Sequence, residues 1–367
     1  MMKIALDGYE LGRDSRGVGR VIRNLLLRVP DLLPEDEFLV YTKEKIGLNG
    51  RSRAHEYVLP GRGGYLRWQN GPLRRALKKS GPDLLVASNY VLPLSCPWHS
   101  FLFEHDISVI AHPEWYPKKY ALTRRYLIRR SLERADLVLV SADFVEKEIR
   151  RFFRLNRDKI KLIGYGLEDK FRPAPEDLKN RWREERGLAG KKVIGFLGSI
   201  FKRRHVPELV LAVERLRREF PEAVLYLVGE DFGVLNGGPA SPLAGREWIR
   251  WEKSLPEEDL PVFYSSLDAF AYLSEYEGFG FPPLEALACG TPPVLLDGSS
   301  LTEIFTGLAV MVKGPDEEGV AAALRTILTG EKTRAGLLAE FERRRSEFSW
   351  ARSAAALAEL IGKVGNR

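Results

Sequence analysis

Two glutamates eight residues apart lie on either side of a glycine turn. The segment 275–292 reads EYEGFGFPPLEALACGTP, with Glu277 before the turn and Glu285 beyond it. A short apolar run, 269–273, precedes the turn, and a helical pattern follows Pro282-Pro283, so we expect a strand, a loop and a helix N-terminus. The free N–H groups and partial positive charge of such a terminus suit a phosphate. A ligand with a diphosphate in its middle and hydroxyl groups at both ends would use all three features.

The segment also has a purely structural interpretation, in which Gly278 and Gly280 form a tight turn and Glu285 favours the positive end of the helix. Its complete string, however, resembles the E-x7-E motif of retaining glycosyltransferases of family 4, which have the GT-B fold. That resemblance implies an α/β protein with two Rossmann-like, doubly wound domains that face each other across a cleft. It also implies that Gly278, Phe279 and Gly280 contact a nucleotide-diphosphate sugar, that Glu277 binds the sugar hydroxyls and that Glu285 binds the ribose.

Length and composition agree with a soluble protein of two domains. The chain has 367 residues, which exceeds one typical core, and no apolar run reaches the ~18 residues of a membrane-spanning helix. The N-terminus leads directly into a strand-like segment, so we expect no signal peptide. Cys96 and Cys289 form neither a disulfide framework nor a zinc site. We therefore expect a cytoplasmic protein.

Charge is unevenly distributed along the chain. Residues 1–170 carry 31 Lys and Arg against 21 Asp and Glu, whereas residues 171–367 carry 26 against 29. A basic N-terminal half can attract anionic lipid, nucleic acid or a phosphorylated substrate. No RNA- or DNA-binding module accompanies this charge, so we do not expect nucleic acid as a partner.

A glycine-rich loop, 8–19, follows the first predicted strand, 4–6, and includes Ser15-Arg16. The order of strand, loop and helix opens a doubly wound unit but lacks the G-x-G-x-x-G of a dinucleotide site. Gly17 and Gly19 match a G-x-G-R loop of family 4, which implies a place over the donor's phosphates or the acceptor. A plain strand-to-helix turn is the alternative.

A histidine follows another predicted strand, 101–103, which delivers Glu104-His105-Asp106 at its carboxyl end. In open α/β sheets, ligands bind beyond those ends. A lone histidine is more often structural, but the string HDISVIAHPEWYP resembles the His-Asp segment of the family. That resemblance implies that His105 borders the sugar from the N-terminal domain, whereas His112 has no such support.

Residues 118–134 form a predicted basic helix with seven Lys and Arg residues. Apolar residues, among them Tyr120 and Leu127, lie between the charges. Peripheral docking on an anionic membrane, at its inner face, would use this combination. A solvated helix face is the simpler explanation, and the sequence alone does not decide between the two.

Four basic or potentially basic residues, 202–205, follow a predicted strand in the second half. Cations at a strand-to-helix junction suit a diphosphate. In family 4 an Arg is often found where this chain has Ser199, and a Lys where it has Arg204. The resemblance therefore implies that Ser199 and Arg204 border the diphosphate, with Lys202 or Arg203 as the second cation. A solvated charge cluster is the alternative.

Two further segments bear on the donor. Residues 248–255 occupy the place where family members hold the nucleotide base, but WIRWEKSL departs from the usual pattern and leaves the base open. Ser300-Leu301-Thr302-Glu303 is typical of a capping box at a helix start. The resemblance places Glu303 near the donor, although capping alone would explain this residue.

We expect four parts in the chain. The resemblance implies an N-terminal, acceptor-side Rossmann-like domain at 1–170 and a nucleotide-sugar-binding domain at 191–347. A charged segment with two prolines, 171–190, is the expected linker between them. The last segment, 348–367, would form a helix that crosses back to the first domain.

Together these features predict a retaining glycosyltransferase that moves a hexose from a nucleotide-diphosphate sugar to a hydroxyl of a glycan or lipid-linked acceptor, such as a growing surface polysaccharide. GDP-mannose is favoured because the HD-x-S and EGFGFPPLEALACGTP strings look most like mannosyltransferases, while UDP- and dTDP-sugars remain open. His105, Glu277 and Arg204 would act at the reacting sugar. No Asp-x-Asp ends a strand and no P-loop occurs, so we expect neither a metal nor another cofactor. A nucleotide-sugar epimerase and a non-catalytic donor-binding protein are the alternatives.

Overall fold

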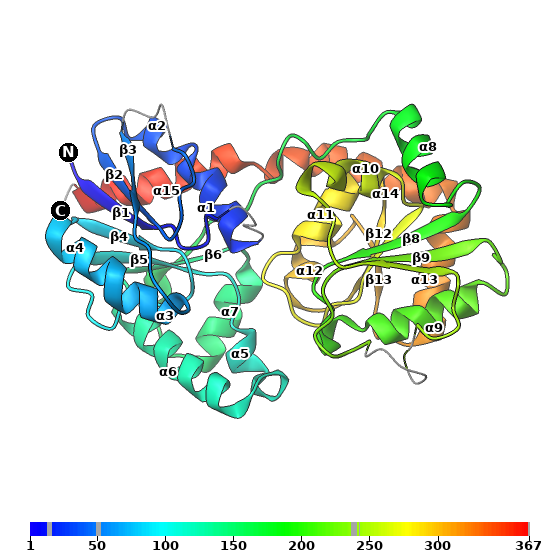
Figure 1. Cartoon of the computed structure of the whole chain (residues 1–367), viewed down its shortest axis with the longest axis horizontal. Helices are drawn as coiled ribbons and strands as arrows, with labels where there is room; N and C mark the ends of the chain where they lie inside the picture. Colours follow the sequence, from blue (N-terminus) through cyan, green and yellow to red (C-terminus); the bar gives the residue numbers. More distant parts are fainter. Residues whose placement is uncertain (13–16, 49–52, 236–240, 242, 366–367) are drawn as a thin grey trace. The chain divides into compact units, whose positions relative to one another are not determined.

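The computed structural model describes residues 1–12, 17–48, 53–235, 241 and 243–365 (Figure 1). Contacts between Cα atoms divide the chain into two compact units. Unit 1 comprises residues 1–166 together with 348–367, and unit 2 comprises residues 167–347. Within the described residues, no helix combines the length and the apolar character that crossing a bilayer requires.

Unit 1 contains a seven-stranded parallel sheet in the order β3-β2-β1-β4-β5-β6-β7. In its register Ala5 pairs with Leu39 between β1 and β2, and Leu6 pairs with Val86 between β1 and β4. The inner strands β4 and β6 are short apolar runs because helices cover both faces of a parallel sheet, whereas the edge strand β3 is mostly exposed. The strand bounds are β1 Lys3–Asp7, β2 Glu37–Thr42, β3 Ala54–Val58, β4 Leu84–Ala87, β5 His99–Glu104, β6 Leu137–Val140 and β7 Ile160–Leu162.

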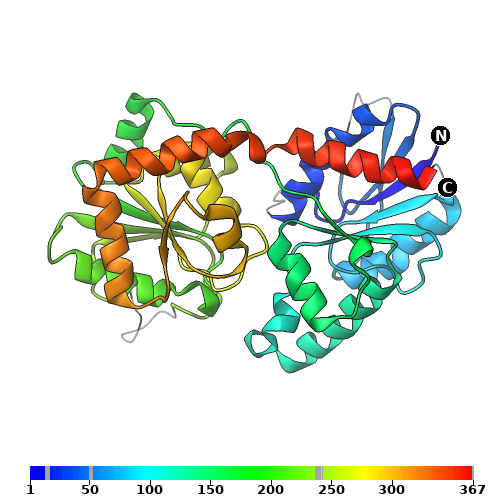
Figure 2. The same cartoon turned by 180° about the vertical axis from the view of Figure 1, so that it is seen from behind.

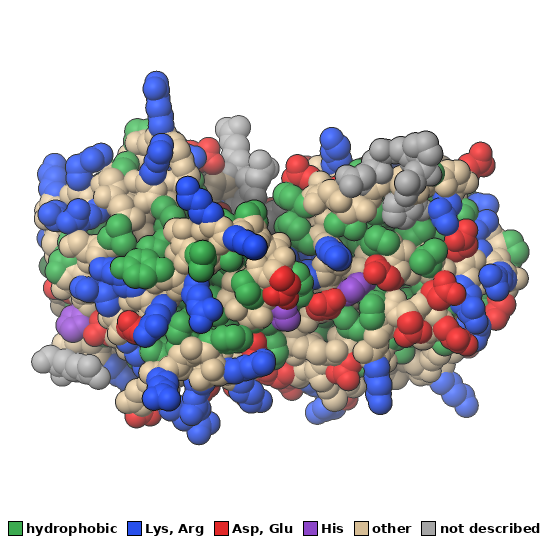
Figure 3. All heavy atoms as spheres, turned by 90° about the horizontal axis from the view of Figure 1, so that it is seen from below, with side chains coloured by type: hydrophobic (Ala, Val, Ile, Leu, Met, Phe, Trp, Pro, Cys, Tyr) green, Lys and Arg blue, Asp and Glu red, His purple; other side chains and the backbone are tan. Residues whose placement is uncertain are grey.

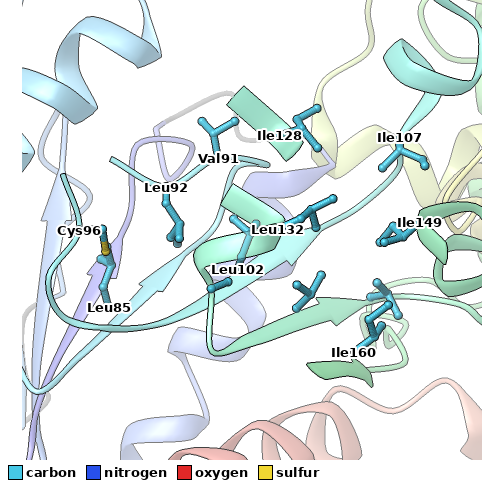
Figure 4. Close-up of a cluster of buried hydrophobic side chains, with 14 of the residues drawn as sticks. Leu85, Val91, Leu92, Cys96, Leu102, Ile107, Ile128, Leu132, Ile149 and Ile160 are labelled. Carbon is cyan, nitrogen blue, oxygen red and sulfur yellow. The ribbon is translucent and has the colours of Figure 1, made fainter. Parts of the chain in front are cut away.

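The helices of unit 1 turn apolar residues toward this sheet. Ile128 and Leu132 of α6 join the cluster in Figure 4, which also holds Leu85 and Leu102 from the strands. The predicted basic helix at 118–134 coincides with α6. The helix bounds are α1 Val18–Leu26, α2 Val29–Leu32, α3 Tyr65–Trp68, α4 Arg74–Ser80, α5 Ser108–Ala111, α6 Lys118–Arg134, α7 Asp143–Phe152 and α15 Trp350–Gly365.

The last helix, α15, belongs to unit 1 and not to the unit that precedes it in the chain (Figure 2). Leu357 and Ile361 of α15 are buried and line a small apolar cavity with Leu25 of α1 and residues of β1. Gly166 lies directly against the first turn of α15, since a Cβ at Gly166 would stand 2.2 Å from the backbone nitrogen of Trp350. Position 166 therefore requires glycine.

Unit 2 contains six parallel strands in the order β10-β9-β8-β11-β12-β13. In its register Ile194 pairs with Leu225 between β8 and β9, and Gly195 pairs with Phe270 between β8 and β11. The strand bounds are β8 Lys192–Leu197, β9 Ala223–Val228, β10 Ile249–Glu252, β11 Ala269–Tyr272, β12 Pro293–Leu296 and β13 Val310–Val312. The helix bounds are α8 Glu176–Glu185, α9 Val206–Leu216, α10 Leu260–Ser265, α11 Phe281–Ala288, α12 Ser299–Phe305, α13 Glu317–Thr329 and α14 Glu331–Arg344.

Half of the expected linker, 171–190, forms α8, which belongs to unit 2. Trp182 of α8 is buried, and its ring centroid lies 5.3 Å from that of Tyr226 and 5.9 Å from that of Phe263. Phe171 and Leu188 of the same segment are buried as well, so three large apolar side chains fix a segment whose other residues are mostly polar or charged. The expected bounds of the four parts of the chain stay a prediction.

In both units the strand order reverses beside the first strand, where β1 lies next to β4 and β8 lies next to β11. This is the topology of doubly wound sheets, in which ligands bind outside the carboxyl ends of the strands at the point of reversal. The predicted α/β fold class with two Rossmann-like domains is confirmed.

Candidate functional site

The predicted donor-binding residues of unit 2 gather where β8 and β11 lie side by side, at the reversal of strand order. The loop after β8 runs through Ser199 into a short 3-10 turn, Lys202–Arg204. The loop after β11 carries Glu277 and leads into α11. The backbone joins the two loops, because the amide of Glu275 donates a hydrogen bond to the carbonyl of Arg203 at 3.0 Å.

Arg204 and Glu277 form an ion pair across these loops. The Nε and Nη2 atoms of Arg204 donate to Oε1 of Glu277 at 3.2 and 3.0 Å, and Nη1 donates to the carbonyl of Ser199 at 2.9 Å. Both side chains are shielded from water, with 12% and 16% of their surface exposed. Charge-assisted hydrogen bonds of this kind hold both groups in one geometry. The basic cluster and the glutamate motif, 73 residues apart in sequence, thus meet at one place.

Glu277 also accepts hydrogen bonds from two residues that the sequence analysis did not name. The hydroxyls of Tyr272 and Ser274 donate to the same Oε1 at 2.9 and 2.8 Å. Burial by itself raises the pKa of Glu277, but the Arg204 and Arg203 charges and these hydroxyls outweigh burial, and the net pKa is lowered. Glu277 is therefore ionised at neutral pH. The position of Tyr272 and Ser274 at a predicted strand end is the sequence signal that points to them.

Tyr272 also supports the arginine. Its ring lies beside the Arg204 guanidinium, whose carbon is 5.1 Å from the ring centroid. Gly198, directly after β8, makes room for this arrangement, because a Cβ there would stand 2.4 Å from Nη1 of Arg204 and its φ is +150°. Strand, glycine and aromatic ring together set the position of the cation.

The cations of the 3-10 turn differ in their surroundings. Lys202 is exposed, whereas Arg203 and Arg204 are half-buried. The Arg203 guanidinium lies over the ring of Phe201, 4.8 Å from its centroid, and its charge helps to lower the pKa of Glu277. This geometry favours Arg203 over Lys202 as the second cation for a diphosphate, and that assignment stays a proposal.

Helix α11 begins next to the ion pair. Its N-cap, Gly280, has a φ of +100°, and a Cβ there would stand 2.6 Å from Leu301. The first turn contains two prolines and no acidic residue, and the N-cap glycine has no side chain to bond its N–H groups. Gly278 and Phe279, which precede it, are buried. The positive end of this helix therefore has no carboxylate in its first turn, which suits a phosphate.

Glu285 lies on the second turn of α11 and is only 2% exposed. Its Oε2 accepts a hydrogen bond from the Tyr264 hydroxyl at 2.8 Å. Burial and the charge of Glu285 raise the pKa of the Cys289 thiol to about 12, so this thiol is protonated and is no nucleophile at neutral pH. A contact between Glu285 and the ribose of a donor stays a prediction.

The expected capping box at the start of α12 is wrong. The helix begins at Ser299 with Gly298 as its N-cap, so Ser300 lies inside the first turn. The Ser300 hydroxyl donates instead to the backbone carbonyl of Glu277 at 2.8 Å, because the glycine loop offers an acceptor there. Glu303 is exposed on α12, and its role near a donor stays a prediction.

The two glycines assigned in the first half lie at the start of α1. Gly17 is the N-cap, with a φ of +55°, and Gly19 is buried in the first turn. The left-handed backbone at Gly17 explains why glycine stands there. Ser15 and Arg16 of the expected loop lie outside the described residues. A contact of Gly17 and Gly19 with the donor stays a prediction.

His105 is buried in unit 1, and both of its ring nitrogens are bonded there. Nε2 lies 2.9 Å from the carbonyl of Ser88, which can only accept, so we assign the hydrogen to Nε2. Nδ1 then accepts from the Tyr165 hydroxyl at 2.6 Å. Burial lowers the pKa of His105, so the ring is neutral at pH 7. Its expected contact with the sugar stays a prediction.

Four carboxylates that the sequence analysis did not assign flank the strand ends around His105. Asp7 ends β1 and accepts from the Tyr65 hydroxyl at 2.6 Å, and burial raises the pKa of Asp7 to about 6. Glu104 ends β5, and among the described residues no hydrogen-bond donor reaches its buried carboxyl oxygens. Burial and the nearby Asp106 raise the pKa of Glu104 well above its usual value. Glu10 is the fourth carboxylate. Their position at or near the carboxyl end of a predicted strand is the sequence feature that could have identified them.

Two family models match the chain. One, described as Glycosyltransferase Family 4, matches residues 15–171, and the other, described as Glycosyl transferases group 1, matches residues 179–340. Among curated proteins, the chain is similar to the O-antigen chain mannosyltransferase B of Escherichia coli, with 29% identity over 67% of this chain and 65% of that protein. It is also similar to a GDP-mannose-dependent alpha-(1-6)-phosphatidylinositol monomannoside mannosyltransferase of Mycolicibacterium smegmatis, with 29% identity over 53% of each chain. The chain thus covers 53% and 65% of the length of these relatives.

Among solved structures, the sucrose-phosphate synthase from Thermosynechococcus elongatus is similar over 100% of both chains, with a TM-score of 0.79 and 19% sequence identity. At that identity the likeness concerns the fold. This likeness in fold supports the assignment of the two doubly wound sheets to the GT-B type.

Proposed function

We propose that the chain, whose residues 15–171 match a family 4 model and whose residues 179–340 match a group 1 model, transfers a hexose from a nucleotide-diphosphate sugar to a hydroxyl of a glycan or lipid-linked acceptor. The observation that carries this proposal is the ion pair between Arg204 and Glu277 beside the start of α11. It combines a cation for the leaving diphosphate, a carboxylate for sugar hydroxyls and a helix N-terminus.

The difficult step in such a transfer is breakage of the anomeric C–O bond to the diphosphate. Negative charge then develops on the leaving group, where Arg204, Arg203 and the first N–H groups of α11 would stabilise it. The described hydrogen bonds to the side chain of Glu277 all end on Oε1, which leaves Oε2 to accept from the sugar hydroxyls. Because the pKa of Glu277 is lowered, its negative charge also favours the oxocarbenium-like sugar.

Retention of anomeric configuration and independence of a metal ion are parts of the proposal that depend on the likeness of 275–292 to the E-x7-E motif. The acceptor oxygen bonds to the anomeric carbon as the diphosphate leaves, and the leaving phosphate takes the acceptor's proton. This route needs no nucleophile from the enzyme, in agreement with the protonated, buried state of Cys289. Glu285 is assigned to the ribose hydroxyls and His105 to the sugar.

GDP-mannose is the favoured donor. The HD-x-S string and the string 277–292 support mannose, as do the names of two relatives, one of which is described as GDP-mannose-dependent. UDP- and dTDP-sugars are the alternatives, because the segment 248–255 departs from the usual family pattern.

The first test is the thermal shift of the purified chain with GDP, UDP, dTDP and ADP, each without and with Mg²⁺. A ligand that binds the folded state raises Tm by mass action. We expect a selective shift with GDP that does not need Mg²⁺. A selective shift with another nucleotide would reassign the donor, and no shift with any of them would contradict the diphosphate roles of Arg203 and Arg204.

Turnover then separates transfer from other activities on the same fold. We expect wild-type protein to need an acceptor, and Glu277→Ala to abolish transfer while the protein stays folded by circular dichroism. Unchanged turnover in Glu277→Ala would contradict the site. Conversion of the sugar nucleotide without an acceptor would indicate an epimerase, and binding without turnover of any sugar nucleotide would indicate a non-catalytic donor-binding protein.

A further inference from the structure

Helix α6 of unit 1 has two different faces. Its inner face, with Ala121, Ile128 and Leu132, is buried in the core. Its outer face carries Leu122 and Tyr126, which are 69% and 63% exposed. These two residues are four positions apart and therefore lie one turn from each other on the same side of the helix. The inner contacts anchor the helix, so its outer face presents large apolar side chains to the surroundings.

Basic residues surround this apolar pair. At 100° per residue, Lys118, Arg125 and Arg129 lie on one side of the pair and Lys119 on the other, and all four are exposed. Glu133 is the single acidic residue in the sequence of α6, and it bonds Arg129 at 2.9 Å. Figure 3 views unit 1, on the left, from the side on which α6 lies, and Lys and Arg side chains there alternate with apolar ones.

A neighbouring loop extends the same surface. Leu94 is 48% exposed, and its carbonyl accepts a hydrogen bond from the guanidinium of Arg130, which ties the loop to α6. Tyr120, at the N-terminal end of the helix, is 46% exposed but lies about 160° around the helix from Leu122, so it belongs to another face. Exposed apolar groups and cations thus occur together over the length of the helix.

We propose that the outer face of α6 docks unit 1 on the surface of an anionic lipid bilayer, with Leu122 and Tyr126 inserted among the headgroups. A helix that lies in the membrane interface pairs an apolar stripe with flanking Lys and Arg, whose long side chains reach the lipid phosphates. Each cation near an anionic leaflet adds to the attraction. Because the helix is fixed to unit 1 by its inner face, docking needs no refolding.

Two other occupants fit this surface less well. A second copy of the chain, joined through the same face by a two-fold axis, would place the cations of one α6 against those of the other. Nucleic acid would satisfy the cations but would leave the aliphatic Leu122, at the centre of the face, without a base-stacking role. A bilayer with anionic headgroups satisfies the charges and the apolar pair together.

The experiment is co-sedimentation of the full chain with vesicles of phosphatidylcholine alone and of phosphatidylcholine with 30–50% phosphatidylglycerol, at about 0.15 M salt. We expect binding to the anionic vesicles and little to the neutral ones. Leu122→Ser and Tyr126→Ser each lower the partition coefficient about tenfold, the scale of losing part of one buried apolar side chain. Leu178→Ser on α8, where Leu178 is also exposed, is the matched control and leaves partition unchanged.

A second pair of variants distinguishes binding through the outer face of α6 from attraction by the positive charge of the unit as a whole. Lys118→Gln with Lys119→Gln lowers binding to anionic vesicles, whereas Lys78→Gln with Lys79→Gln, an equal charge change on α4 of the same unit, does not. Equal losses from both pairs would overturn the proposal, as would equal binding to neutral vesicles or no binding to anionic ones. Dimerisation that Leu122→Ser abolishes, or RNA binding stronger than vesicle binding, would replace the membrane with that partner. None of these measurements uses turnover, so their result is independent of the proposed transfer reaction.

Discussion

The two sheets have the same strand order around their first strand and carry different ionisable groups at the same topological position. In unit 1, where β1 lies next to β4, the loops carry Asp7 and Glu10, and the end of the next strand adds Glu104. In unit 2, where β8 lies next to β11, the loops carry Arg203 and Arg204 beside Glu277, together with the exposed Glu275, which bonds His205. Among the described residues of these loops, which do not include Arg13 and Arg16, carboxylates therefore outnumber cations in unit 1 and cations outnumber carboxylates in unit 2.

The bonds that join the two loops differ in the same way. In unit 1 neutral donors make them: the Ser88 hydroxyl donates to the carbonyl of Asp7, and the Asn89 amide donates to Glu10, both at 2.7 Å. In unit 2 the ion pair between Arg204 and Glu277 joins the loops, beside the backbone bond from Glu275 to Arg203. Carboxylates suit the hydroxyl groups of sugars, and guanidinium groups suit phosphates. The comparison teaches that strand topology decides where a ligand binds, while the loop side chains decide which charge that ligand has.

The largest expected effect comes from removing the cation that distinguishes unit 2. Arg204→Ala should lower kcat about 10²–10³-fold, or about 2.7–4 kcal/mol of barrier, as for the loss of one oxyanion donor. Arg204→Lys keeps the charge but not the two bonds to Glu277, so its kcat should be intermediate. Steady-state kinetics with GDP-mannose measure both variants. An equally large loss in Lys202→Ala would contradict the assignment, because Lys202 is exposed.

Asp7 in unit 1 should affect how the free energy of unfolding depends on pH. Burial raises the pKa of Asp7 from 3.8 to about 6, so between these values the folded state holds a proton that the unfolded state lacks. The free energy of unfolding therefore falls as pH rises through this window, by about 3 kcal/mol in total. Asp7→Asn has no such proton, so this fall should be absent from its urea unfolding between pH 4 and 7.

Glu277 in unit 2 should change the free energy of unfolding with pH in the opposite direction, so it is an internal control for the Asp7 experiment. The pKa of Glu277 is lowered, so its contribution to stability is present above the ordinary value of 4.5 and is lost as pH falls through the folded pKa. Glu277→Gln should therefore weaken the rise of the free energy of unfolding with pH on the acid side. Asp7→Asn should make that rise steeper. Parallel curves for wild type and Asp7→Asn would contradict the account of unit 1.

The smallest expected effect concerns the support of the ion pair. Tyr272→Phe removes the hydroxyl that bonds Glu277 but keeps the ring beside Arg204, so about 1.5 kcal/mol should be lost, which lowers kcat about tenfold. The acid limb of the pH–rate profile should also shift upward, because Glu277 loses a donor. Tyr226→Phe, which removes a hydroxyl that bonds Glu252 in the same unit, is the matched control. A lowered kcat in the control, or none in Tyr272→Phe, would indicate that the hydroxyl does not act through Glu277.

Periodic patterns in the sequence predicted the framework well. The basic helix at 118–134 and the strand before Gly198 agree with α6 and β8, because their apolar spacing reports the packing that forms them. The capping box at Ser300 failed because a hydroxyl bonds whichever acceptor is near, and here the nearest is the carbonyl of Glu277. The position of α8 was not readable either, since Trp182 is the buried residue of this helix and its other residues have the composition of a linker.

Prediction of the site from the sequence was limited in the same way. Arg204 and Glu277 were predicted from motif and charge, and the structure brings them together. Tyr272 and Ser274, which hold Glu277, and Asp7, which bonds Tyr65, were not predicted. Their roles depend on which strands lie side by side, a relation between distant segments that no local pattern contains. Listing every polar residue at a predicted strand end would have found all three.

The membership of α15 in unit 1 has a consequence for synthesis. Unit 1 lacks one of its helices until residues 348–367 have been made, and all of unit 2, residues 167–347, is translated first. At about 5–20 residues per second that takes about 10–35 s. During that time the apolar surface around Leu25 has no covering helix. On the ribosome, the half of the chain that is translated first is therefore the half that finishes folding last.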